Sequence, residues 1–224
     1  MRLRREVLVA VLGAYLLSAR PGLAADPRPL RFGIHLGMAA SNFHGQLHDL
    51  AGLESRTQLT GGAFAAVRLS RYVALQPELN YVPRGAKTSG LATDVDGNVI
   101  GPFETHWDLK YLELPVLVRL TLPTEGRVVP SVYASPTLSY RLDAAARSEG
   151  PVGIIGSIPS RDLKNDTHAI DSGFSVGTGL EIGAGPGAVT LDGRYTFGLR
   201  NIFTGTGAAN DKNRTLSVTL GYLF

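Results

Sequence analysis

The sequence predicts an all-β fold, an eight-stranded antiparallel up-and-down transmembrane β-barrel. The most informative segment is residues 214–224, where apolar side chains alternate with smaller or polar ones, as in a β-strand, up to an aromatic final residue. Seven more segments alternate in the same way, and the connections between the eight are alternately long and short. An apolar outer face, a polar interior and loops of alternating length are typical of barrels that cross an outer membrane.

Residues 1–24 have the features of a secretory signal peptide. Three arginines lie among the first five residues, residues 7–17 form an apolar run of 11, and small residues flank Leu23. This run is too short for a transmembrane helix, which needs about 20 residues. We therefore expect a signal peptide at 1–24 and one outer-membrane β-barrel domain at 25–224.

Charge and composition exclude some classes of function. The chain has 22 Lys and Arg against 19 Asp and Glu, and without residues 1–24 both counts become 18. A neutral chain has no overall electrostatic attraction to nucleic acid, so we expect no nucleic-acid partner. The absence of cysteine excludes disulfide bonds and thiolate metal sites.

The four strands expected in the N-terminal half are 32–40, 61–69, 72–84 and 106–120. Each has apolar side chains at every second position: Phe32, Ile34, Leu36 and Met38; Ala63, Ala65, Val67 and Leu69; Val73, Leu75, Leu79 and Tyr81; Leu112, Leu114, Val116, Val118 and Leu120. Polar residues such as Gln76 and Asn80 fall on the opposite faces.

The four strands expected in the C-terminal half are 129–142, 173–183, 188–200 and 214–224. The sixth strand alternates small residues with larger ones, and the last two alternate clearly: Val189, Leu191, Tyr195, Phe197 and Leu199 in the seventh; Leu216, Val218, Leu220, Tyr222 and Phe224 in the eighth. The other side of the last strand has Thr215, Ser217, Thr219, Gly221 and Leu223.

The connections are expected to be short at 70–71, 121–128 and 184–187, and long at 41–60, 85–105, 143–172 and 201–213. Within the second long connection, Asp96-Gly97 is typical of a hairpin turn. We prefer this interpretation to a calcium loop starting at Asp94, because Val99 stands where such a loop requires glycine.

Six charged residues fall on the polar faces of their strands: Glu78, Glu113, Arg119, Glu181, Asp192 and Arg194. An arginine facing lipid would cost about 2–4 kcal/mol at mid-bilayer, so these side chains are expected inside the barrel. An eight-stranded barrel has room inside for little but side chains, and buried charges need partners. We therefore expect a salt-bridge network that joins the third, fourth, sixth and seventh strands.

Three stretches carry a resemblance to a known family: Gln76-Pro-Glu-Leu-Asn-Tyr-Val82, Tyr111-Leu-Glu-Leu-Pro-Val-Leu-Val-Arg119 and Gly221-Tyr-Leu-Phe224. The chain resembles the PorT-like outer-membrane β-barrel family of Gram-negative bacteria, and the first two stretches look like that family's third and fourth strands. The resemblance extends over residues 32–224. It implies an eight-stranded barrel in the outer membrane, and it implies no reaction because the family has no catalytic motif.

We expect no catalytic, cofactor-binding or metal-binding residues. His44, His48, His106 and His168 fall in the predicted outer loops, where we interpret them as solvated side chains. An enzyme built on the loops would need such groups within hydrogen-bond reach of one another.

The function that we expect is that of a small closed barrel in the cell outer membrane, with a structural or partner-docking role through its four outer loops. Its expected partners are outer-membrane lipid and another envelope protein. The alternative is a solute-binding or narrow-channel barrel, which requires a less filled interior. A secreted barrel of lipocalin type would instead need its apolar stripes to face a ligand cavity.

Overall fold

The computed structural model describes residues 30–45, 54–94, 96–122, 124, 126–150, 158–202 and 211–224. Within these residues, nine β-strands form a single sheet. The expected signal peptide at 1–24 lies outside the described residues. No helix among the described residues is both long and apolar enough to span a membrane.

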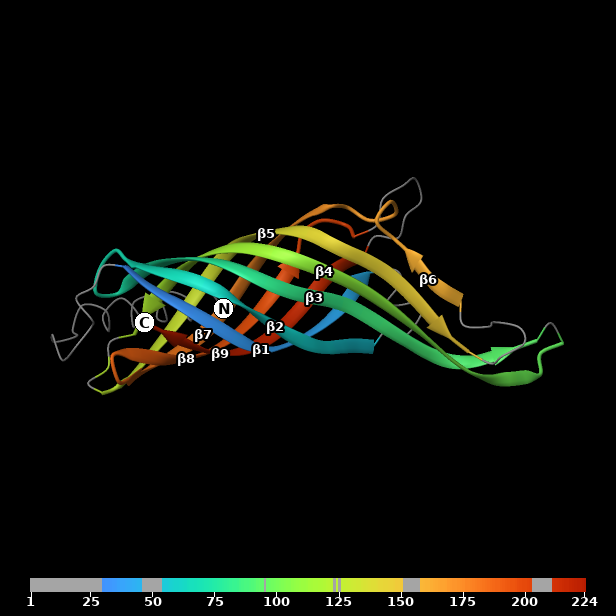
Figure 1. Cartoon of the computed structure of the whole chain (residues 1–224), viewed down its shortest axis with the longest axis horizontal. Coiled ribbons are helices and arrows are strands. Elements are labelled where there is room, and N and C mark those ends of the chain that lie inside the picture. The colour runs from blue at the N-terminus through green and yellow to red at the C-terminus, as the bar shows by residue number, and fades with distance from the viewer. Residues whose placement is uncertain are drawn as a thin grey trace, which may run out of the picture.

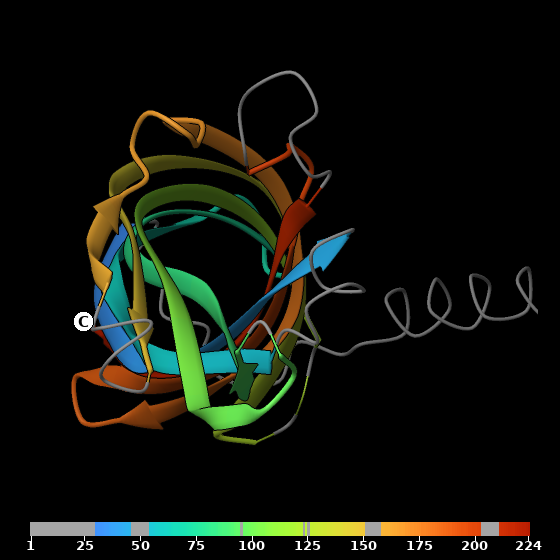
Figure 2. The same ribbon diagram turned by 90° about the vertical axis from the view of Figure 1, so that its right-hand side faces the viewer.

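Eight of the strands close into a ring. The strands are β1 (Leu30–Gly45), β2 (Glu54–Arg68), β3 (Val73–Thr93), β4 (Val99–Thr121), β5 (Val128–Glu149), β6 (Ile158–Asp162), β7 (Ile170–Ala184), β8 (Gly187–Gly198) and β9 (Asp211–Leu223). The order in the sheet is β4-β3-β2-β1-β9-β8-β7-β5, and β4 also pairs with β5, which closes the ring seen end-on in Figure 2. The short strand β6 pairs with β5 outside the ring. The predicted fold class is confirmed.

The first and last strands of the ring complete the barrel. Strand β1 pairs antiparallel with β9 from Gly33 opposite Leu223 to Gly45 opposite Asp211. Gly37 allows the two backbones to approach, since a Cβ at this position would overlap the carbonyl oxygen of Val218. The ring therefore leaves neither β1 nor β9 as an open edge along this length.

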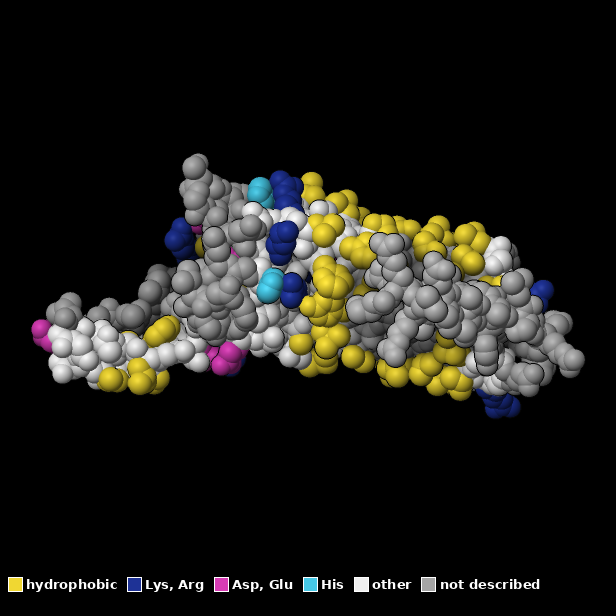
Figure 3. Space-filling model, turned by 180° about the vertical axis from the view of Figure 1, so that it is seen from behind, with side chains coloured by type: hydrophobic (Ala, Val, Ile, Leu, Met, Phe, Trp, Pro, Cys, Tyr) yellow, Lys and Arg dark blue, Asp and Glu magenta, His cyan; other side chains and the backbone are white. Residues whose placement is uncertain are grey.

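Apolar side chains form a belt around the outside of the barrel, visible from behind in Figure 3. Phe32 is 59% exposed, Leu36 63% and Val218 52%. The polar residues on the opposite faces of these strands, such as Thr215, are buried or half-buried inside. A continuous exposed apolar surface of this kind is stable in lipid and unfavourable in water. The face assignment is confirmed, and the lipocalin-type alternative is wrong because its apolar stripes would face inward.

The strands are longer than the sequence pattern predicts. Much of the expected connection 85–105 is strand, because β3 continues to Thr93 and β4 begins at Val99. The expected connection 41–60 likewise contains the ends of β1 and β2. Beyond the lipid the outer face of a strand no longer has to be apolar, so the alternation that identifies a strand is lost there.

The predicted hairpin turn lies at the tip of β3 and β4. Asp94 accepts hydrogen bonds from the backbone of Asp96 (3.0 Å) and Asn98 (2.8 Å), and Gly97 has a φ of 87°. A hydrogen bond from the Asn98 side chain, together with these backbone hydrogen bonds, holds the pKa of the Asp94 carboxyl below its ordinary value. The hairpin prediction is confirmed.

The two ends of the barrel differ. One end, here the short-turn end, has tight turns such as 69–72, where the Ser70 hydroxyl accepts hydrogen bonds from the backbone of Tyr72 and Val73. At the opposite end, the loop end, β3 and β4 extend well beyond the other strands (Figure 1). The belt lies between the two ends.

The belt generates a first prediction. Val218→Arg places a charge on the lipid-facing side of β9, opposite Met38, and is expected to cost about 2–4 kcal/mol or to block insertion. The measurement is refolding in lipid vesicles, followed by an SDS gel of boiled and unboiled samples.

The matched control is Val99→Arg, which makes the same change at a residue that is 61% exposed but lies at the tip of the projecting hairpin. It is expected to refold like the unaltered protein. Equal insertion of both variants would contradict the assignment of the lipid-facing surface.

Candidate functional site

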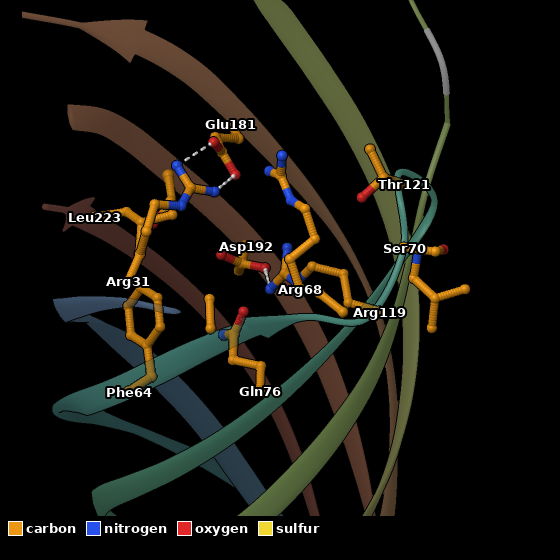
Figure 4. A pocket seen from close by; sticks show the side chains of 14 residues that line it. Arg31, Phe64, Arg68, Ser70, Gln76, Arg119, Thr121, Glu181, Asp192 and Leu223 are labelled. Carbon is orange, nitrogen blue, oxygen red and sulfur yellow. Dashed lines mark hydrogen bonds and ion pairs between the residues drawn. The ribbon is translucent and has the colours of Figure 1, made fainter. Parts of the chain in front are cut away.

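The interior of the barrel is filled by layers of paired charges. At the short-turn end, Arg31 on β1 donates two hydrogen bonds to Glu181 on β7, at 2.8 and 3.1 Å. Arg119 on β4 pairs with Asp192 on β8 at 2.6 Å. Figure 4 shows both pairs pointing into the same space, and Gly179 provides part of the room, because a Cβ there would overlap Arg119 and Asp192. These pairs link four strands across the barrel.

The next layer is centred on Glu78, which is 4% exposed. Its carboxylate accepts hydrogen bonds from Gln76 (2.8 Å) and Asn80 (2.7 Å) on the same strand and pairs with Arg194 on β8 (2.8 Å). The Tyr133 ring lies between two arginines, with the guanidinium of Arg119 at 4.7 Å and that of Arg194 at 5.5 Å from its centroid. The Tyr133 ring therefore connects the layer of Glu78 to the layer of Arg119 at the short-turn end.

The third layer surrounds Arg84, which is 1% exposed. Its guanidinium pairs with Glu113 on β4 and with Asp171 on β7, the latter at 3.0 Å. It also lies 4.9 Å from the centroid of the Tyr111 ring, and Asn213 donates a hydrogen bond to Asp171 at 3.1 Å. One buried cation thus holds two buried carboxylates from different strands.

An apolar cluster closes the interior toward the loop end. Its members are Phe43, Ala86, Leu109, Tyr111, Ala144, Leu163 and Ile202, with Trp107 and Ala146 packed against them. Leu163 and Ile202 come from connecting segments, which backbone hydrogen bonds fix: Leu163 donates to Ala144 (3.0 Å) and His168 donates to Ile202 (3.0 Å). The cluster covers the layer of Arg84 on its loop-end side.

Two cavities lie inside the described barrel, and both are small. A cavity of about 40 Å³ lies at the short-turn end between Arg31, Arg68 and Arg119, and another of about 20 Å³ lies near His35 and Arg194. One water needs about 10–15 Å³ of such volume. These cavities therefore accommodate a few waters and not a solute.

The structure places all six charged residues selected from the sequence on the inner face. Glu78 with Arg194 and Arg119 with Asp192 pair among themselves. Glu113 and Glu181 pair instead with residues that sequence reasoning missed.

The missed residues are Arg31, Arg84 and Asp171, so the layers also involve β1. Arg84 lies an even number of residues from Gln76 and Glu78. Alternation along the strand could therefore have placed it on the same inner face. Arg31 and Asp171 lie just outside the predicted strands 32–40 and 173–183, so no inner or outer face was predicted for them.

The four histidines that the structure describes do not gather at one site. His35 is inside and stacks on Phe64 with ring centroids 5.7 Å apart, whereas His44 is exposed on β1 and His106 lies 3.5 Å from Glu104. His48 lies outside the described residues. Among the residues that the structure describes, no three His, Asp or Glu side chains form a group able to hold a metal ion.

A sheet projects from the loop end. Strand β2 stops pairing with β3 at Lys87, and beyond it β3 pairs only with β4 among the described strands. Lys87 bridges Glu54 (3.2 Å) and Glu104 (3.7 Å), and these carboxylates raise its pKa above the ordinary lysine value. The ion pairs join β2, β3 and β4 at the base of the projection.

The Arg84 layer generates the second prediction. Arg84→Met removes the cation between two buried carboxylates and is expected to cost about 3–5 kcal/mol of unfolding free energy. Adding Glu113→Gln and Asp171→Asn removes both carboxylate charges that Arg84→Met leaves unpaired, and it is expected to restore most of that stability. The measurement is urea titration in lipid vesicles.

Lys110→Met is the control, because Lys110 pairs with Asp143 at 3.1 Å on the surface, where an ion pair contributes about 0–1 kcal/mol. A triple variant no more stable than Arg84→Met would show that unpaired charge is not the cause.

The outer membrane protein beta-barrel domain matches residues 18–204. Similar solved structures include Neisserial surface protein A, with 16% identity and a TM-score of 0.44 over 85% of this chain and 95% of that one. OprG from Pseudomonas aeruginosa has 11% identity and a TM-score of 0.44 over 87% and 95%.

A third similar structure is the outer membrane protease OmpT from Escherichia coli, with 9% identity and a TM-score of 0.43 over 91% of this chain and 99% of that one. No curated protein matches this chain as a relative. At such low identities these likenesses concern the fold alone. Because the family match covers most of its length, the chain belongs to the outer membrane protein beta-barrel domain family.

Proposed function

We propose that this outer-membrane protein is a closed structural anchor that presents the projecting part of β3 and β4 to a partner outside the cell. The observation that carries the proposal is the combination of a filled interior with strands that continue past the lipid belt. In barrels of this type short turns face the periplasm and long loops face outward. The loop end, with its projecting sheet, is then the part that a partner can reach.

The projecting sheet has the features of a docking surface. Leu91 on β3 is 64% exposed and Val99 on β4 is 61% exposed, and both lie beyond the belt. The outer part of β3, residues 89–93, pairs on one side only among the described strands. An edge strand with exposed apolar side chains can add a partner strand through its backbone. A protein partner of the cell envelope fits this chemistry.

Other functions have less support. A solute-handling barrel needs interior space, and the cavities in the described interior have water-like dimensions. We expect no catalysis, because the described loop-end histidines form no group. Among the described residues at the loop end, no nucleophile with a positioned base is apparent. Within the family, membership of the PorT-like branch remains our proposal, based on the stretches 76–82 and 111–119.

Photo-crosslinking in intact cells tests the docking role. A photoreactive residue at Leu91 is expected to give a discrete adduct with one envelope or extracellular protein. The matched control is the same residue at Leu36, which is 63% exposed but faces lipid, and it is expected to give no such protein adduct. Absence of an adduct from both Leu91 and Val99 in correctly inserted protein would overturn the proposal.

A further inference from the structure

Two basic side chains stand on the outer surface at the point where the apolar belt ends. On β9 the residues that face lipid are Leu220, Val218 and Leu216. Arg214 and Lys212 continue the same side of the strand toward the loop end, and Arg214 is exposed. Figure 3 shows Lys, Arg and His side chains along this border of the belt.

The register of the barrel fixes the surroundings of these two residues. Leu216, the last apolar residue of the row, lies opposite Ala40 on β1 and Tyr195 on β8. One step outward, Arg214 lies opposite Asn42 and Phe197, and a further step outward Lys212 lies opposite His44. The positive charges therefore sit directly above lipid-facing apolar side chains.

The charge of this pair is not neutralised within the described part of the chain. Neither Lys212 nor Arg214 has an ion pair there, and the neighbouring Asp211 is fully buried. The connection 201–213 contains no other acidic residue.

The opposite wall of the barrel is different. There Lys110 and Lys164 both pair with Asp143, at 3.1 and 3.4 Å, and Arg161 pairs with Asp166 at 2.8 Å. These three cations are thus ion-paired, in contrast to Lys212 and Arg214.

We propose that Lys212 and Arg214 bind the phosphate-bearing headgroup of an anionic lipid in the outer leaflet, with its acyl chains along Leu216 and Phe197. The site is continuous with the lipid-facing belt, so a bound lipid places its headgroup at the level of the two cations. A guanidinium donates two parallel hydrogen bonds to a phosphate, and an ammonium beside it adds a second charge. Basic residues at a membrane surface attract anionic lipid in this way. The inference rests on the outer-membrane location and is independent of the docking role.

Native mass spectrometry of the refolded protein in neutral detergent tests the site. The probe is lipid A, a glycolipid with two phosphates, and phosphatidylcholine is the neutral reference. Lys212→Gln combined with Arg214→Gln is expected to weaken lipid A binding about 30-fold, because each surface cation contributes about fivefold. Binding of phosphatidylcholine is expected to stay unchanged.

The control is Lys110→Gln with Arg161→Gln, which removes the same charge from ion-paired residues at the loop end and is expected to leave binding within about twofold of the unaltered protein. The exchange Lys212→Arg with Arg214→Lys keeps the charge and is expected to retain binding, which separates charge loss from misfolding. Equal weakening in the control, no weakening in the double variant, or full displacement of lipid A by inorganic phosphate would each overturn the proposal.

Discussion

The constraint on which the structure depends is that no backbone N–H or C=O group can remain unpaired in the hydrocarbon of a membrane. A sheet meets this constraint only when it has no edge, and here β1 pairs with β9 while β4 pairs with β5. Closure then divides every strand into a side that meets lipid and a side that meets the interior. The alternation of Leu216, Val218 and Leu220 with buried or half-buried polar residues follows from that division.

Closure with eight strands leaves an interior that only side chains fill. The charged residues on the inner face must therefore neutralise one another, which is why Glu78, Arg84 and Arg119 each meet an opposite charge from another strand. Toward the loop end the interior changes from paired charges to an apolar cluster, so it resembles the core of a soluble protein. The same barrel thus gives a packed base to the strands that project from it.

The sequence predicts the parts of the structure that span the membrane. In the belt one face of each strand must be apolar, so the strands and the inner position of Glu113 or Asp192 can be predicted from alternation. The extension of β3 to Thr93 could not be predicted, because outside the lipid that requirement ends. The closing of the loop end by Leu163 and Ile202 also escaped prediction, since it depends on contacts between segments far apart in the chain.

The central claim is that the interior is filled along its length, and planar-bilayer conductance tests it most directly. Protein that shows the boiling-dependent gel shift of a folded barrel would be inserted at neutral pH, and the current would be recorded over a range of voltages. The layers of paired charges and the apolar cluster predict no stable open-channel current. A steady, reproducible single-channel conductance from the unaltered protein would contradict the account and favour a solute-passing barrel.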